Sequence, residues 1–248
     1  ETSRLTKVFN NLISSVQSTF EKEKQFNQNV SHELRTPLSV IVSESEFGSK
    51  YADNLEETKE SLTVIHRQAK LMKSMTEQIL EISKTQHLQW SDLKPVCLST
   101  LVSDYCQGQE RKWGESPIAF EVSIQPDLWI QGDAVLVTRM LDNLLSNAVK
   151  FTKTKVAIHL VASPAGAVLK VADDGIGIAP DHLSKIWDRF YQVEDSRNKG
   201  LNSGIGLGLS FIKDIADLHR AEVKIISEEG KGSLFRVTFP QIQDKTSV

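Results

Sequence analysis

The sequence lacks several features that would assign it to a class of protein at once. No apolar run approaches the roughly 20 residues that a membrane-spanning helix needs, and no signal peptide opens the chain. Its two cysteines, Cys97 and Cys106, have neither metal-ligand spacing nor companion histidines, so we expect buried thiols in a reducing compartment. A net charge of −3 supplies no basic field, which argues against nucleic acid as the main partner.

What is present begins with the pattern of two long helices. Apolar residues recur at helical spacing over about residues 4–47 and again over about 55–84, with Gly48 as a stop signal and Asp53-Asn54 as a start signal. Two helices joined by a short loop cannot enclose a core, so we expect two copies of this hairpin to pair into a four-helix bundle. The chain opens in helical register, as though more sequence precedes it.

The periodicity changes after a polar linker at residues 86–95. Stretches rich in β-branched and aromatic residues then alternate with helical ones, which predicts a mixed sheet with helices, α+β in class. The expected strands are residues 118–124, 156–162, 168–172, 223–226 and 234–239, and the expected helices are residues 99–113, 133–150 and 206–219. Hairpin turns are expected at residues 164–166 and 229–232.

Residues 31–37, Ser-His-Glu-Leu-Arg-Thr-Pro, place an ionisable imidazole on the first helix. The apolar stripe of this helix consists of Val30, Leu34, Leu38 and Ile41. At about 100° per residue, His32 lies about 200° away from its neighbours on that stripe, so it points to solvent. An exposed histidine is either a reactive group or a surface residue without a function.

The residues next to His32 favour the interpretation that it is a reactive group. Glu33 can orient the imidazole and accept its proton. Pro37 removes a backbone donor and should bend the helix about one turn further on. The segment is not a zinc-binding helix, because Thr36 stands where the second histidine of that motif belongs.

Two clusters in the second domain suit a phosphate-bearing ligand. Asn143, Asn147 and Lys150 are spaced to lie on one helix face, where amide oxygens can complete the shell of a hard cation and an ammonium can meet phosphate. In residues 173–180, Asp-Asp-Gly-Ile-Gly-Ile-Ala-Pro, glycines allow close backbone approach and a carboxylate can accept from an exocyclic amine. A solvated helix face and a plain turn are the structural alternatives.

Two further clusters frame a polar segment. Residues 186–192 are aromatic and suit either the anchor of a mobile loop or a core cluster. Residues 204–208, Gly-Ile-Gly-Leu-Gly, open a helix whose amides can face phosphates, although the spacing is not that of the dinucleotide fingerprint. The polar residues 194–203 between them have the composition of a lid.

In this order, the clusters resemble the sensor histidine kinases of two-component systems over about residues 20–240. Five motifs carry the resemblance: the H box around His32, the N box at 143–151, the first G box at 173–177, the F box at 186–192 and the second G box at 204–208. Residues 1–18 resemble, more weakly, the last helix of a HAMP relay module.

The resemblance implies a domain order. It comprises a relay helix at residues 1–21, a HisKA-type dimerisation and histidine phosphotransfer domain at 22–88, a catalytic ATP-binding α/β sandwich of the GHKL (Bergerat) type at 89–243, and a tail at 244–248. The hairpin would form the dimeric four-helix bundle.

The resemblance also implies the activity of a protein histidine kinase, which phosphorylates itself from ATP and passes the phosphate to an aspartate of a response regulator. His32 would accept the phosphate, while Glu33 would hold the proton of the other ring nitrogen. Thr36 would position a water for dephosphorylation of the regulator. The implied partners are a second copy of the chain and a receiver domain.

The ATP-binding roles follow the matching positions. Asn147 would bind Mg²⁺ with help from Asn143, Lys150 would contact phosphate, and Asp173 would read the adenine amino group. The other implied pocket residues are Phe151, Gly175, Gly177, Gly204, Gly206, Leu207 and Gly208. The full-length protein would act at the cytoplasmic side of the bacterial inner membrane, attached through a part that precedes this soluble fragment.

The sequence departs from the family pattern at several positions. Gln192 stands where an arginine commonly faces the γ-phosphate, which leaves open whether Arg189 or Arg197 takes that role. The other departures are Trp187 for Phe, Ile205 for Thr, and Arg220-Ala221 where glycines are frequent.

Two rival functions share the nucleotide fold. ATP hydrolases of the kind found in DNA gyrase, heat-shock chaperones and mismatch-repair proteins carry a glutamate base four residues before the metal-binding asparagine. Asn143 occupies that position here, and an amide cannot take a proton from water. A degenerate kinase that serves as a scaffold needs a broken acceptor or metal ligand, and both His32 and Asn147 are present.

Overall fold

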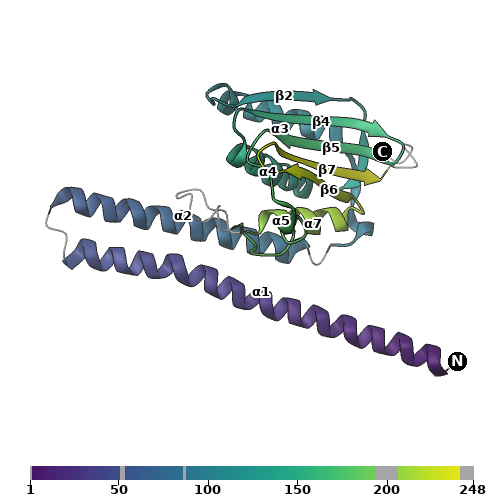
Figure 1. Cartoon of the computed structure of the whole chain (residues 1–248), viewed down its shortest axis with the longest axis horizontal. Coiled ribbons are helices and arrows are strands. Elements are labelled where there is room, and N and C mark those ends of the chain that lie inside the picture. The colour runs from purple at the N-terminus through teal and green to yellow at the C-terminus, as the bar shows by residue number, and fades with distance from the viewer. Residues whose placement is uncertain (1, 51–53, 86–87, 194–205, 241–248) are drawn as a thin grey trace. The chain divides into compact units, whose positions relative to one another are not determined.

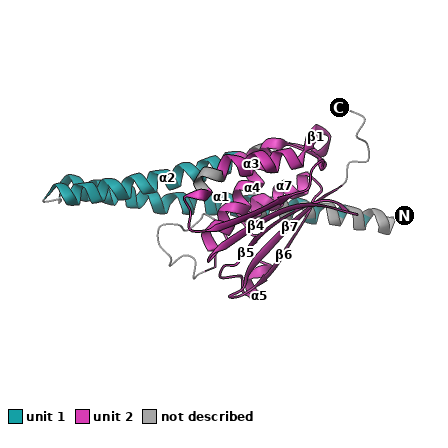
Figure 2. Cartoon of the chain, turned by 90° about the horizontal axis from the view of Figure 1, so that it is seen from above, with its two compact units in different colours: residues 1–80 teal, residues 81–248 magenta. Residues whose placement is uncertain are grey.

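The chain forms two compact units, residues 1–80 and residues 81–248 (Figure 2). The computed structural model describes residues 2–50, 54–85, 88–193 and 206–240, so Gly204 and the predicted lid at 194–203 lie outside the described residues. None of the helices in these ranges is both long enough and apolar enough to cross a bilayer.

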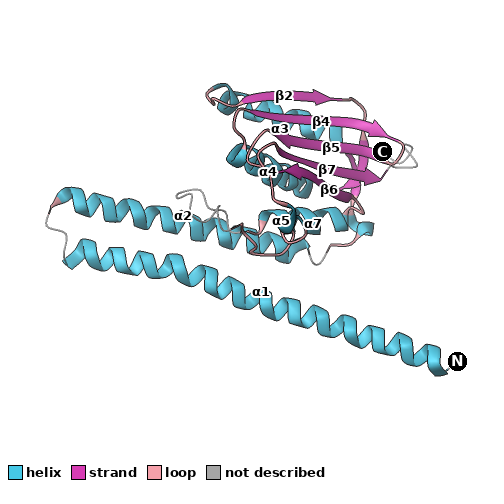
Figure 3. Ribbon diagram, viewed as in Figure 1, coloured by secondary structure: helices cyan, strands magenta, loops and turns pink. Residues whose placement is uncertain are grey.

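The first unit is built on a helical hairpin, as predicted. Helix α1 (Thr2–Lys50) runs as one helix through Pro37, and α2 (Leu55–Thr85) returns alongside it (Figures 1 and 3). Asn54 starts α2, because its side-chain oxygen accepts from the Glu57 N–H at 2.9 Å and its amide donates to the Glu57 carboxylate at 3.0 Å.

The expectation that Gly48 ends the first helix is wrong, since α1 continues to Lys50. The structure gives Gly48 another role. A β-carbon at Gly48 would lie 3.4 Å from the β-carbon of Ser61 on α2, and Ser61 is 3% exposed. Two small residues therefore let the helices approach closely near the hairpin turn.

The second unit contains a five-stranded mixed sheet covered on one face by helices (Figures 1 and 2). The helices are α3 (Leu98–Gly114), α4 (Ala134–Phe151), the short α5 (Pro180–Leu183) and α7 (Gly208–Leu218). The strands are β2 (Ala119–Ile124), β4 (Lys155–Ser163), β5 (Gly166–Asp173), β6 (Glu222–Glu228) and β7 (Gly232–Pro240), in the order β2-β4-β5-β7-β6. Among the described strands of this sheet, only β2 and β4 pair in parallel, which confirms the predicted mixed sheet with helices.

A small second sheet was not predicted. Strands β1 (Lys94–Cys97) and β3 (Trp129–Gly132) pair antiparallel, and the 3-10 turn η1 (Trp90–Asp92) precedes them. The interpretation of residues 86–95 as linker throughout is therefore wrong from Trp90 onward. Four-residue strands that contain a proline or a glycine carry too little alternation to be recognised from sequence.

The core lies between the sheet and the helices α3, α4 and α7. Alternate residues of β4, namely Val156, Ile158 and Leu160, are fully buried. Helix α4 buries Leu136, Val137, Met140, Leu141, Leu144, Leu145 and Ala148. Asp133 caps this helix by accepting from the N–H groups of Val135 (2.8 Å) and Leu136 (3.0 Å). Burial on one side of α4 leaves its polar face outward.

His219 joins the end of α7 to the start of α4. Its side chain is fully buried, its Nδ1 lies 2.7 Å from the Ile215 carbonyl oxygen, and its Nε2 accepts from the Asp133 N–H at 3.0 Å. A carbonyl can only accept, so Nδ1 carries the proton and the ring is neutral. Burial lowers the pKa of His219.

We predict that His219 makes the stability of the fold fall at acid pH. The pKa of His219 is lower in the folded than in the unfolded state, so its contribution is present above about pH 6.5 and is lost as the pH falls below that value. Urea unfolding of the parent and of His219→Gln between pH 8 and 5.5 should show a stability difference that narrows with acidity.

The exposed His66 on α2 supplies the control, because His66→Gln retains the buried His219 and should lose stability toward acid pH as the parent does. A parent-to-His219→Gln difference that stays constant over this range would contradict the neutral-ring assignment.

Candidate functional site

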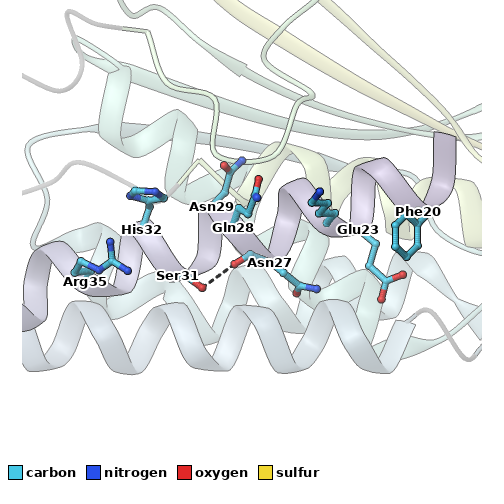
Figure 4. Close-up of a pocket in the computed structure, with 9 residues that line it drawn as sticks. Phe20, Glu23, Asn27, Gln28, Asn29, Ser31, His32 and Arg35 are labelled. Atoms are coloured by element: carbon cyan, nitrogen blue, oxygen red, sulfur yellow. Dashed lines mark hydrogen bonds between the residues drawn. The ribbon is translucent and has the colours of Figure 1, made fainter. Parts of the chain in front are cut away.

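His32 lies on an exposed polar face of α1. A pocket is lined there by residues of this helix, namely Phe20, Glu23, Lys24, Asn27, Gln28, Asn29, Ser31, His32 and Arg35. Figure 4 shows His32, Asn29 and Gln28 projecting to the same side of the helix. His32 is exposed, as its position off the apolar stripe predicted.

The ring of His32 is not held by its neighbours. Within the described parts of the chain, no hydrogen bond reaches either ring nitrogen, and the half-buried Glu33 carboxylate is not bonded to the ring. The Thr36 hydroxyl lies one turn further on and donates to the His32 carbonyl at 3.4 Å. Both ring nitrogens are therefore open to a ligand or a reactant.

The polar face of α4 brings together the three predicted residues of the N box. Asn143, Asn147 and Lys150 are all half-buried, beside the buried face of the helix. The Lys150 ammonium lies 4.8 Å from the centroid of the Phe151 ring, and burial lowers its pKa. The Asn147 amide makes no hydrogen bond to any part of the chain that the structure describes.

Asn143 is more constrained than Asn147. Its side-chain NH₂ donates to the Arg139 carbonyl at 2.9 Å, one turn back along α4. Its side-chain oxygen lies beside Gly208, where a β-carbon would come within 2.8 Å of it. The amide is thus fixed between α4 and the first residue of α7.

The adjacent carboxylates at the end of β5 have opposite environments. Asp174 accepts from the N–H groups of residues 153–155 at 2.9–3.0 Å and contacts the hydroxyls of Thr152 and Thr154. These donors hold the pKa of Asp174 well below its usual range. Burial instead raises the pKa of Asp173, with partial compensation from the N–H groups of Gly175 and Ser233. The hydrogen bonds of the Asp174 carboxylate are therefore taken up by the loop at residues 152–155, whereas the Asp173 carboxylate can still accept hydrogen bonds from a ligand.

The glycines of the G boxes lie where a side chain does not fit. A β-carbon at Gly175 would come within 2.0 Å of the Phe151 carbonyl oxygen, so Phe151 and Gly175 pack backbone to backbone. A β-carbon at Gly177 would come equally close to the Glu228 carbonyl oxygen. Gly206 has a φ of 77°, and its carbonyl accepts from the Phe190 N–H at 2.8 Å. The Leu207 side chain is 1% exposed, so any contact it makes with a ligand is through its backbone.

Side chains of the F box contact other elements of the second unit. Trp187, one of the departures from the family pattern, packs edge-on against Phe235 with ring centroids 6.3 Å apart. Arg189 pairs with Asp214 of α7 at 2.9 Å, and burial raises the pKa of that carboxyl against the effect of the arginine. The Tyr191 hydroxyl lies 2.6 Å from the His182 ring. Arg197 and Ile205 lie outside the described residues.

Sequence reasoning missed two supporting groups. The hydroxyls of Thr152 and Thr154, which fix Asp174, follow the N box directly, and an alternation of threonines after a helix is a signal for such a turn. The bridge from His219 to Asp133 spans 86 residues and has no local signal.

Substitution of the two carboxylates should affect the stability of the fold to different extents. We expect Asp174→Ala to lower the free energy of unfolding by about 2 kcal/mol, because several hydrogen bonds to a charged group are lost. Asp173→Asn removes a desolvated charge and retains an acceptor, so it should change the stability by less than about 0.5 kcal/mol. Urea denaturation at pH 7 measures both, and equal losses would show that the assignment of roles is wrong.

Comparison with known proteins covers both units. Residues 22–88 match the family model of the His Kinase A (phospho-acceptor) domain. Residues 132–243 match the family model described as histidine kinase-, DNA gyrase B- and HSP90-like ATPase. The acceptor-type match contains His32, and the ATPase-type match contains the N box and both G boxes.

Relatives with similar sequence carry both regions. The chain is 31% identical over 234 residues to the sensor histidine kinase YkoH of Bacillus subtilis, which covers 94% of this chain and 51% of YkoH. It is 32% identical over 238 residues to the phosphate regulon sensor protein PhoR of Pseudomonas aeruginosa, covering 93% of this chain and 53% of PhoR. The chain thus spans about half the length of the curated relatives it matches.

Solved structures agree on the fold. The histidine kinase ThkA, solved in complex with the response regulator protein TrrA, matches with a TM-score of 0.70 at 22% identity, over 89% of this chain and 62% of that one. The Acinetobacter baumannii histidine kinase AdeS matches with a TM-score of 0.63 at 18% identity, over 85% and 98% of the two chains. The two family models, the relatives and the ordered motifs show that the chain belongs to the sensor histidine kinases of bacterial two-component systems and forms their catalytic portion.

Proposed function

We propose that this chain binds ATP in its second unit and transfers the γ-phosphate to His32, from which the phosphate passes to an aspartate of a response regulator. The observation that carries the proposal is the contrast between the Asp173 and Asp174 carboxylates at the end of β5. Asp173 is a desolvated carboxylate with acceptor capacity to spare, and it lies in the same unit as a half-buried row of two amides and an ammonium on α4. This combination suits a ligand with an exocyclic amine and phosphates.

On the donor side, Asp173 accepts from the adenine amino group and Lys150 contacts phosphate. Gly175 and Gly177 keep the backbone near Asp173 free of side chains, and Gly206 and Gly208 do the same at the start of α7. Among the described residues no three His, Cys, Asp or Glu side chains cluster as a metal site. A Mg²⁺ ion would therefore be held by the Asn147 amide oxygen and by the phosphates, whose charge it neutralises.

On the acceptor side, a ring nitrogen of His32 attacks the γ-phosphorus. The N–P bond forms as the bond to the β-phosphate oxygen breaks, and ADP leaves. Glu33 accepts the proton of the other ring nitrogen in the reacting state, which makes the ring a better nucleophile. Catalytic hydrogen bonds of this kind often tighten only in the reactive complex. We further propose that Thr36, one turn beyond His32, positions a water when the phosphorylated regulator is dephosphorylated.

The position of Asn143 argues against a water-activating ATPase. Its NH₂ group is committed to the Arg139 carbonyl and its oxygen lies against Gly208, so it is an oriented amide and not a base. Transfer to His32 needs no base at this position, because the histidine supplies the nucleophile.

We predict that the purified chain acquires acid-labile, base-stable phosphate from Mg-ATP. His32→Gln should abolish the label, because it removes the nucleophilic nitrogen and leaves the donor site intact. The matched control is His66→Gln, which replaces another exposed histidine of the same hairpin and should label like the parent. Labelling of His32→Gln at the parental level would show that His32 is not the acceptor.

Calorimetry on the same variants separates the residue that accepts the phosphate from the residues that bind ATP. His32→Gln should bind ATP with parental affinity, whereas Asp173→Asn should bind at least ten-fold more weakly, because an amide presents an NH₂ group or a weaker acceptor to the adenine. Unchanged ATP affinity in Asp173→Asn would remove the basis of the donor assignment.

We also propose that the functional unit is a dimer formed by the hairpin. Apolar side chains on both helices are exposed in the single chain, namely Leu38 (50%), Val42 (51%), Phe47 (43%), Leu55 (71%) and Leu62 (59%). Apolar surface of this kind on two adjacent helices is what a second hairpin would cover. A sensing part and an attachment to the inner membrane, outside these residues, remain part of the proposal and are supported by the greater length of the relatives.

Light scattering at micromolar concentration should therefore give the mass of a dimer. Val42→Glu, which places a charge on the exposed apolar face, should shift the mass toward the monomer, while Glu44→Lys at a half-buried polar position nearby should not. A parental chain that is monomeric at these concentrations would contradict the dimer.

A further inference from the structure

The hydroxyl of Ser227, near the end of β6, joins the G-box loop (residues 174–179, between β5 and α5) to the hairpin of β6 and β7. It donates to the Gly232 carbonyl at 2.9 Å and accepts from the Ile178 N–H at 2.8 Å. The Ser233 hydroxyl lies 3.0 Å away. A hydroxyl has one proton, and the Gly232 carbonyl can only accept, so Ser233 is the donor to Ser227. The Ser227 hydroxyl therefore uses its one donor and both of its acceptor sites.

The same hairpin holds the middle of the G-box loop through its backbone. The Gly230 N–H donates to the Ile176 carbonyl at 2.7 Å, and Gly177 lies against the Glu228 carbonyl so closely that a β-carbon would not fit. Among the residues that the structure describes, Ser227 is the one whose side chain bonds to the backbone of residues 177–179. Its hydroxyl therefore fixes the part of the loop that leads into α5.

Ser163 has a similar local geometry at the other end of β5. It is the last residue of β4, and its hydroxyl donates to the Gly166 carbonyl at 3.0 Å and accepts from the Ala165 N–H at 3.2 Å. Both serines thus close a hairpin through a glycine carbonyl. They differ in the N–H group that they accept from, which belongs to the turn itself for Ser163 and to the G-box loop for Ser227. Comparison of the two separates support of a hairpin from support of the loop.

We infer that Ser227 is a positioning residue for the nucleotide, which acts by ordering the G-box loop next to Asp173 before ATP binds. The inference rests on the proposed binding of ATP around Asp173. A loop that is already ordered loses less conformational entropy when a ligand binds to it. Ser227 is not among the residues assigned to the nucleotide, so it acts through the loop.

The size of the effect follows from the bond to Ile178. Without the hydroxyl, the Ile178 N–H loses its partner, and residues 177–179 gain freedom that ATP binding must remove. The net contribution of one neutral hydrogen bond corresponds to a change of about five-fold in an equilibrium constant. Once ATP is bound the loop is ordered with or without the hydroxyl, so the rate of phosphoryl transfer at saturating ATP stays the same.

The test measures ATP affinity by calorimetry and the rate of autophosphorylation at saturating Mg-ATP, in the complete chain. Ser227→Ala should bind ATP about five-fold more weakly and label at the parental saturated rate. Ser227→Thr keeps the hydroxyl and should retain most of the affinity. Ser163→Ala is the matched control, because it should lose a similar amount of stability toward urea and bind ATP as the parent does.

A second variant covers the case in which Ser227→Ala does not fold. Ser227→Cys places a thiol, which makes only weak hydrogen bonds, in nearly the same space. It should bind ATP at least about two-fold more weakly than the parent and label at the parental saturated rate.

The outcomes separate this inference from the proposed function. Parental ATP affinity in Ser227→Ala, or in Ser227→Cys if only that variant folds, would overturn the positioning role and leave the kinase assignment intact. Equal losses of affinity in Ser227→Ala and Ser163→Ala would also overturn it, because any weakened hairpin would then have the same effect. A saturated rate that falls together with the affinity would place the effect in the transfer step, which overturns it as well. A parent that does not bind ATP, or binds it and never labels, would instead show that the proposed function is wrong.

Discussion

The register of α4 against the sheet is the constraint on which the nucleotide site depends. Seven residues of this helix are buried against the sheet and the neighbouring helices, so its rotation is fixed to within a fraction of a turn. Asn143, Asn147 and Lys150 are half-buried beside this apolar face, so the packing of the face sets their positions. The ends of α4 are fixed as well, by the Asp133 cap and its bond to His219 at the start, and by the packing of Phe151 on Gly175 at the end. A small rotation of α4 would move all the polar groups together.

The two units contribute different chemistry to one proposed reaction. The hairpin presents a histidine whose ring is unrestrained by the described residues, on a polar strip of α1 (Figure 4). The second unit presents fixed groups, because Asn143 is held between two helices and Asp174 organises the loop next to Asp173. A fixed donor site and an open acceptor suit a mechanism in which positioning and charge stabilisation supply most of the rate, as in other phosphoryl transfers.

The sequence predicted the helices and the large sheet because their apolar periodicity is strong. It could not predict β1 and β3, whose four residues each are held together by pairing with each other and not by local preference. The role of Gly48 was misjudged because a glycine that ends a helix and a glycine that admits a neighbouring helix look the same in one dimension. For the site, sequence motifs placed Asp173 and Asp174 together, but their division of roles depends on Thr152 and Thr154, 20 or more residues away. The left-handed Arg220 explains why glycine is frequent there in the family that the chain resembles.

The central claim is that phosphate from ATP bound in the second unit is carried on the imidazole of His32. Tandem mass spectrometry of the parental chain after incubation with Mg-ATP, with all handling at neutral to alkaline pH, tests this claim most directly. The account predicts a single phosphoryl group, located on His32. A phosphoryl group on serine, threonine, aspartate or another histidine, or none on a chain shown to bind ATP, would contradict it.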